Sequence, residues 1–274
     1  MKSRYLLGVV TLLAITWTAT THAQSSDSDC CDSDCCDCKS SGIVGGVDLM
    51  FLRLYARQGA GGNSAAGNID DYFPDYGFNV TGRYWLGYEM SDGLGIRARF
   101  FEWQHSRAYL GRNREQAFKI VDVEATLDST FYNWELTGIG GIRWGSIQLD
   151  GSDFGEPNPM NFEGTGLTLG VELRRPFWRN LSLIGGARYS VLCGQTDFEP
   201  VSTAVLGDTF IDITEVRLGV EWEMQMGSGG RLFANGVWEH QIYTTDTYMP
   251  FAIDPETVGD VSLAGPAFSI GINR

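Results

Sequence analysis

The sequence contains few histidines, and nothing in their surroundings predicts catalysis. Of the three, His22 lies in the leader described below, so His105 and His240 remain. His105 lies beside Ser106, and His240 follows Glu239 with Asp246 six residues on, but neither spacing is that of a catalytic triad. The glycines lie within strands or turns rather than in a phosphate-binding loop. The sequence therefore predicts neither an enzyme nor a bound cofactor.

Long apolar runs and helical periodicity are also missing. After the first residues, no stretch approaches the roughly 18 apolar residues that a membrane-spanning helix needs. The chain of 274 residues has 35 Gly and 8 Pro, and no long run repeats with a helical period. If this is a membrane protein, it crosses the membrane with strands.

Residues 1–23 have the pattern of a secretory signal peptide. Lys2 and Arg4 precede an apolar run from Tyr5 to about Trp17, and Thr21-His22-Ala23 is a small-residue cleavage site. The run is too short for an anchoring helix.

Removing Lys2 and Arg4 lowers the Lys and Arg count from 20 to 18, against 34 Asp and Glu. This acidity argues against nucleic acid and anionic lipid heads as partners, and favours cations, basic partners or simply solubility.

Residues 24–42 form a segment rich in Cys and Asp, for which we expect flexibility. It contains Cys30, Cys31, Cys35, Cys36 and Cys38. Export permits disulfides, but cysteines this close together cannot all pair locally without strain. Three interpretations stay open: a thiolate cluster for soft metals such as zinc or copper, disulfide cross-linking to other chains, or a linker. The spacing fits no zinc template. The sixth cysteine, Cys193, is expected to be a buried bystander.

From residue 43 onward the alternation of side chains predicts ten β-strands. The clearest example is 181–192, where every second residue is apolar, small or aromatic. The predicted strands are 45–55, 78–90, 94–103, 117–127, 132–147, 166–174, 181–192, 214–224, 231–243 and 261–272.

The connections between these strands alternate between long and short. The long ones are 56–77, 104–116, 148–165, 193–213 and 244–260, and the short ones are 91–93, 128–131, 175–180 and 225–230. In an outer-membrane barrel every second connection is a tight periplasmic turn, and the others are long and face outside. An even strand number with a long first connection places both termini in the periplasm. We therefore predict an all-β fold for 43–274: an antiparallel up-and-down transmembrane barrel of about ten strands.

One face of the predicted strands is charged, and we assign it to the lumen. Alternation alone also fits a soluble barrel with its apolar face inside. Balanced charge, with a basic strand beside an acidic one, suits an interior in which charges pair across strands. Aromatic residues near strand ends suit a membrane interface (Tyr88, Trp134, Trp144, Trp178, Trp222). The expected lumen-lining residues are Arg83, Glu89, Arg97, Arg99, Asp122, Glu124, Glu135, Arg143, Glu172, Arg174, Arg188, Glu215, Arg217, Glu221 and Glu223.

The block Gly45-Gly46-Val47-Asp48-Leu49-Met50-Phe51-Leu52-Arg53, after an export signal and a Cys-containing spacer, resembles the first strand of the Legionella-type major outer membrane protein family. The resemblance extends loosely over 43–274 and implies a pore-forming barrel in the outer membrane. It also implies outer-membrane lipid and the barrel insertion machinery as partners. One departure is the end of the chain, Asn273-Arg274, where such barrels commonly end on an aromatic residue that this machinery recognises.

Two functions follow for a barrel of this size. About eight strands leave an interior filled by side chains, and about sixteen leave a water channel. Our first hypothesis is a narrow porin-like channel for small solutes or ions. The alternative is a plugged structural or surface-interaction barrel that presents acidic loops, with Asp70, Asp71, Asp197, Glu199, Asp208, Asp254 and Glu256.

Overall fold

A computed structural model describes residues 41–57, 77–109, 112–153, 156–198, 206–226, 230–245 and 260–273. The predicted signal peptide, the Cys-rich segment with its five cysteines, and parts of the long connections lie outside the described residues. No helix among the described residues is long and apolar enough to cross a membrane.

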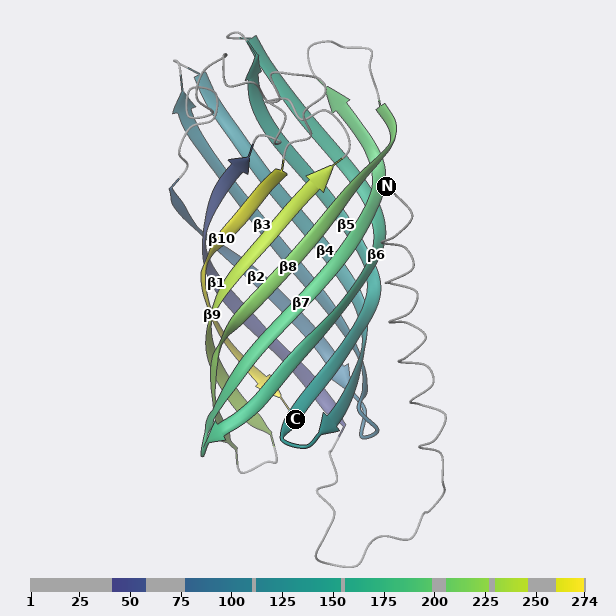
Figure 1. The fold of residues 1–274 in the computed structure, drawn as a ribbon, viewed down its shortest axis with the longest axis vertical. Helices are drawn as coiled ribbons and strands as arrows, with labels where there is room; N and C mark the ends of the chain where they lie inside the picture. The colour runs from purple at the N-terminus through teal and green to yellow at the C-terminus, as the bar shows by residue number, and fades with distance from the viewer. Residues whose placement is uncertain are drawn as a thin grey trace, which may run out of the picture. The chain divides into compact units, whose positions relative to one another are not determined.

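Ten antiparallel strands form a closed barrel (Figure 1), as the alternation predicts. Each strand pairs with its neighbours in sequence, and the first and last strands close the ring, with Gly45 opposite Ile272 and Arg57 opposite Asp260. The strands are β1 Gly42–Arg57, β2 Phe78–Glu89, β3 Leu94–Tyr109, β4 Arg112–Phe131, β5 Trp134–Asp153, β6 Glu156–Trp178, β7 Leu181–Phe198, β8 Leu206–Gln225, β9 Arg231–Thr245 and β10 Asp260–Asn273.

The connections at one end of the barrel, which we call the turn end, are short. Gly93 adopts the left-handed backbone conformation (φ 86°) between β2 and β3, which glycine accepts without steric cost. We predicted that 128–131 is a turn and that a strand starts at Tyr132, which is wrong. Instead β4 continues to Phe131, and the turn is Tyr132-Asn133 with φ 52° at Tyr132.

The predicted turn 175–180 is also too long. Strand β6 continues through Pro176 to Trp178, and its pairing with β7 shifts register between these two residues. Proline lacks the N–H that a regular ladder needs, so it is tolerated at a strand end beside such an irregularity.

The strands are longer than predicted at the opposite end, which we call the far end. Most of the predicted connections 104–116, 148–165 and 193–213 are strand: β3 reaches Tyr109, β5 reaches Asp153 and β7 reaches Phe198. The sequence predicts loops in these segments because they are rich in polar residues and in Gly, Asn, Asp and Pro.

The polarity of the alternation reverses along strand β4. Toward the turn end, Asp122 and Glu124 are buried, whereas Val123 and Leu127 are exposed. Toward the far end, Phe118 and Ile120 are buried, whereas Lys119 lies outside and pairs with Glu102 at 3.2 Å. The same side of the strand faces inward throughout, but the interior changes from charged to apolar.

The outward side chains agree with this division. On the turn-end half they are predominantly large and apolar, including Val47, Leu49, Tyr84, Leu86, Ile142, Leu167, Leu183, Leu218, Val220, Phe268 and Ile270, all of them exposed. Aromatic residues occur at the turns themselves, where Tyr132 is 86% and Trp178 is 69% exposed. An apolar outer surface with aromatic residues at its edge fits a bilayer and its interface.

Candidate functional site: the barrel interior

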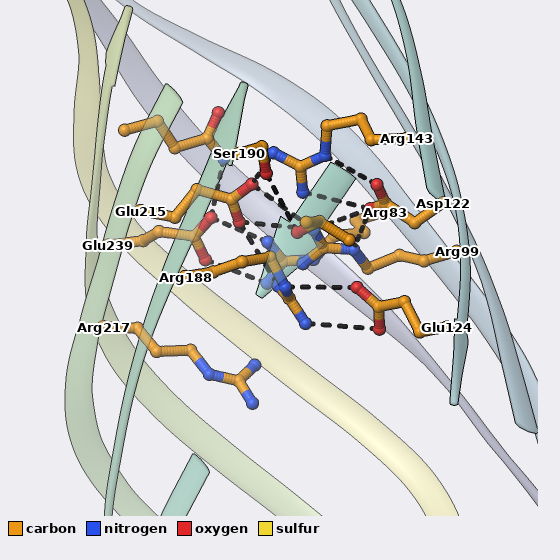
Figure 2. Close-up of polar contacts among 12 residues, drawn as sticks. Arg83, Arg99, Asp122, Glu124, Arg143, Arg188, Ser190, Glu215, Arg217 and Glu239 are labelled. Carbon is orange, nitrogen blue, oxygen red and sulfur yellow. Dashed lines mark hydrogen bonds and ion pairs between the residues drawn. The ribbon is translucent and has the colours of Figure 1, made fainter. Parts of the chain in front are cut away.

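The described interior has three levels, which we name from the turn end upward. The vestibule is a cavity lined by side chains, and above it lie two layers of packed side chains, the charged layer and the apolar core. The charged layer consists of Arg83, Arg97, Arg99, Arg143, Arg188 and Arg217 with Asp48, Asp122, Glu124, Glu172, Glu215 and Glu239. Six arginines thus face six carboxylates, and Figure 2 shows most of them converging from different walls of the barrel.

The centre of the charged layer is formed by a row across three neighbouring strands. Arg99, Asp122 and Arg143 are register partners on β3, β4 and β5. Asp122 accepts from Arg143 Nε at 2.6 Å and pairs with Arg99 Nη2 at 2.7 Å. Glu215 of β8 reaches across the lumen and lies 2.5 Å from Arg143 Nη1 and 3.3 Å from Arg99 Nη2. The row and its cross-lumen carboxylate therefore connect strands that are not neighbours in the sheet.

A second group joins β1, β2 and β9. Arg83 Nε donates to Asp48 at 2.6 Å, and its two terminal nitrogens donate to the two carboxylate oxygens of Glu239 at 2.7 and 2.8 Å. This two-point arrangement is the strongest geometry available to an arginine and a carboxylate. All three side chains are nearly inaccessible to solvent.

The third group lies next to the vestibule. Arg188 Nε is 3.1 Å from Glu124, while Glu172 lies 3.3 Å from Arg97 Nη2 and 2.9 Å from Arg217 Nη2. Arg217 is the most accessible arginine of the charged layer, with 29% of its side chain exposed. In Figure 2 it lies apart from the crowded centre.

The apolar core lies on the far-end side of the charged layer. It contains Met50, Leu52, Leu54, Phe101, Trp103, Phe118, Ile120, Ile147, Leu149, Met160, Phe162, Leu192, Ile211, Ile213, Tyr243, Val261 and Leu263. Phe118 packs on Trp103 and Tyr243, with ring centroids 5.7 and 4.8 Å apart. The Tyr243 hydroxyl donates to Gln241, which in turn donates to Glu239. The core is thereby hydrogen-bonded to the charged layer.

The vestibule is a cavity of about 280 Å³ on the turn-end side. Arg174 forms its main ion-pair centre, at 2.9 Å from Glu135, 2.8 Å from Glu221 and 2.5 Å from Glu223. Glu89, Asn235 and Arg231 also line the cavity, together with the rings of Trp85 and Phe233.

The structure brings together all fifteen charged residues singled out in the sequence: Arg97, Arg99, Asp122, Glu124, Arg143, Glu172, Arg188, Glu215, Arg217 and Arg83 in the charged layer, and Glu89, Glu135, Arg174, Glu221 and Glu223 in the vestibule. Sequence analysis missed Asp48 and Glu239, the two partners of Arg83. Asp48 is the one charged residue on the inner side of β1, and the inner side of β9 mixes polar and apolar residues, so neither strand showed a charged face.

The remaining residues that we considered lie apart from one another. His105 is on the inner side of β3 beside Trp103, whereas His240 is on the outer side of β9, next to exposed Trp238. Cys193 is exposed, which contradicts the expected burial. Its β7 position alternates with buried Leu192, so its side chain faces outward.

Comparisons with known proteins point to an outer-membrane protein. A family model described as "Legionella pneumophila major outer membrane protein precursor" matches residues 38–273. A comparison with the curated proteins gives no match.

Solved structures of three membrane barrels are similar to the chain. For the outer membrane protease OmpT from Escherichia coli the identity is 8%, the TM-score is 0.45, and the alignment covers 88% of this chain and 98% of that one. For the β-domain of the Bordetella autotransporter BrkA the identity is 12% and the TM-score is 0.46, and the alignment covers 85% of this chain and 98% of that one. For a major outer membrane protein from Thermus thermophilus the identity is 13% and the TM-score is 0.35, and the alignment covers 84% of this chain and 98% of that one. Because these scores lie below 0.5, the fold assignment rests on the strand pairings of the chain itself.

Proposed function

The chain belongs to the Legionella pneumophila major outer membrane protein family and is thus an outer-membrane β-barrel, and we propose that its lumen is closed to solutes. In this proposal the barrel anchors the chain in the membrane and presents its far end to the outside. Its acidic connections then form the surface that meets partners, and the lumen does not conduct solutes at rest.

The main observation behind the proposal is that described side chains fill the cross-section of the lumen above the vestibule. Trp103, Phe118, Met50, Leu149 and Tyr243 of the apolar core are at most 1% exposed. In the charged layer Arg143 is fully buried between Asp122 and Glu215. A ten-stranded barrel is near the size at which its own side chains fill the interior, so both the geometry and the packing support closure.

The reversed polarity of the far-end half supports an outward-facing role. There the strands have an apolar inside, and their outside includes polar side chains such as Lys119 and Glu102, which are both 44% exposed, beside a few apolar ones such as Phe78 and Phe210. A surface of this kind is stable in water. The described strands therefore extend beyond the apolar outer belt.

A narrow channel for small solutes or ions is the second candidate, and the vestibule favours it. The cavity reaches the charged layer, where Arg217 and Arg97 keep 29% and 13% of their side chains exposed. Conduction through the rest of the lumen would require the apolar core to move. The family description names no reaction, and we propose no enzymatic activity.

Solute flux in liposomes distinguishes the two candidates. Vesicles containing the folded barrel should release trapped ions and small sugars no faster than protein-free vesicles. Arg188→Ala and Glu172→Ala should lower thermal stability, because each leaves confined partners unpaired. A hydrated channel predicts the opposite: flux in the wild type, nearly unchanged stability, and shifts in cation-over-anion selectivity of opposite sign in the two variants.

A further inference from the structure

An aromatic platform crosses the seam of the barrel inside the vestibule. Trp85, Gly46, Gly271 and Phe233 are successive register partners on β2, β1, β10 and β9. A Cβ atom at Gly46 would come within 3.0 Å of the Trp85 ring, and one at Gly271 within 2.5 Å of the Phe233 ring. The two glycines therefore leave the space in which both rings lie flat over the strands.

The two rings form one surface. Their centroids are 6.1 Å apart and their planes differ by 17°. The guanidinium of Arg97 lies 5.8 Å from the Trp85 ring, so this ring already faces a cation. Aromatic faces carry a negative quadrupole and attract ammonium and guanidinium groups.

The charge around the platform is unequal. The charged layer is neutral, with six arginines and six carboxylates. Among the described residues, seven carboxylates and seven arginines line the vestibule. Five of these arginines and two of these carboxylates belong to the neutral charged layer, which leaves, nearer the turn end, Glu89, Asp128, Glu135, Glu221 and Glu223 against only Arg174 and Arg231. A cleft with an excess of one charge and low-dielectric walls concentrates ions of the opposite charge.

We propose that the vestibule is a binding site for a small organic cation with an apolar or ring-shaped body. Its charged group lies near Glu221 and Glu223, and its body lies on the Trp85–Phe233 platform. An excess of carboxylates alone would serve any cation, but the platform adds an apolar contact that an inorganic ion cannot use. With a cavity of about 280 Å³, the site takes a ligand at the small end of the usual range.

Calorimetric titration of the full-length barrel in a nonionic polyoxyethylene detergent, with benzyltrimethylammonium as the probe, tests the proposal. We expect saturable one-to-one binding that weakens as salt is added. The double substitution Glu221→Gln and Glu223→Gln should weaken it by about tenfold or more, and Trp85→Leu by a similar factor, which corresponds to about 1.4 kcal/mol. Trp85→Phe, which keeps a ring, should lose less.

Matched controls separate this site from general effects. Trp178→Leu and Glu163→Gln change an aromatic and an acid on the outer surface, so both should bind the probe like the wild type. Benzenesulfonate should not bind. Thermal unfolding of each variant shows whether the barrel is still folded, and Trp85→Phe provides the comparison if Trp85→Leu is not.

Three outcomes would overturn the proposal: no saturable binding to the wild type, equal affinity in the vestibule variants and the controls, or equal binding of the neutral analogue benzyl alcohol. Binding of glucose that depends on Trp85 but not on salt would assign the platform to sugars instead. The closure of the lumen is a separate matter, because conductance in the wild type would contradict the proposed function and leave the binding result unchanged.

Discussion

Arg143 shows how a fully buried arginine is accommodated in this barrel. Its guanidinium lies 2.6 Å from Asp122 and 2.5 Å from Glu215, and its side chain has no exposed surface. Moving such charges out of water is expensive, so they are stable only as a paired set. Arg217 has the same chemistry but keeps contact with the vestibule, with 29% exposure and Glu172 at 2.9 Å.

The comparison of these two residues gives the first prediction. Arg143→Met should lower the free energy of unfolding by about 3–5 kcal/mol, because it leaves buried carboxylates short of a partner. Arg217→Met should cost less than about 1 kcal/mol, since water reaches this site and a partly exposed pair contributes little. Urea unfolding in lipid vesicles, followed by tryptophan fluorescence, measures both. Equal and small losses would mean that water fills the charged layer.

At the scale of the strand, the main feature is the change of polarity along its length. In β8, Ile211 and Ile213 are buried toward the far end, and Glu215 follows them on the same inner side. The outer residues change from the half-buried Asp212 to the exposed Val216 and Leu218, although Phe210, nearer the far end, is also exposed. The position of this change marks the edge of the apolar outer belt.

The second prediction tests that edge. Val220→Arg and Leu183→Arg, on the apolar part of the outer surface, should each destabilise the barrel by about 2–4 kcal/mol in a bilayer. Ser146→Arg and Gln148→Arg are matched controls on the far-end part of β5, where outward positions are polar, and should cost little. Folding equilibria in vesicles give the four values. Similar costs at all four positions would contradict a boundary along the strands.

Strand number was easier to predict from the sequence than strand length. Ten strands and their antiparallel closure were predictable, because side-chain alternation and the order of connections are local properties. The far-end segments were mistaken for loops, since they are rich in polar residues and in Gly, Asn, Asp and Pro, which are typical of connections. The partners Arg83–Glu239 and Arg143–Glu215 meet across the lumen, and no spacing in one strand reveals such a contact.

At the scale of the whole molecule, the two ends of the barrel differ. The turn end carries short connections, the vestibule and exposed aromatic residues such as Tyr132 and Trp178. The first residue of β1 and the last of β10 lie at this end as well, since Gly42 pairs with Glu89 and Asn273 with Arg231. Short turns in outer-membrane barrels face the periplasm, so we propose that the chain enters and leaves the barrel on that side.

The third prediction concerns this orientation. In a background with its native cysteines replaced by serine, Ser106→Cys at the far end should react with a membrane-impermeant thiol reagent on intact cells. Ser91→Cys in the turn between β2 and β3 should react only after the outer membrane is permeabilised. Both positions are exposed, so a difference reports the side of the membrane. Labelling of Ser91→Cys alone would reverse the proposed orientation.

The most direct test of closure is the conductance of the wild-type barrel in a planar lipid bilayer. Insertion is verified on the same preparation by protease protection and by the stability of the folded band on gels. The apolar core and the charged layer together predict a silent membrane at moderate voltages, even when many barrels are inserted. Discrete and reproducible current steps from the wild type would contradict the closed lumen.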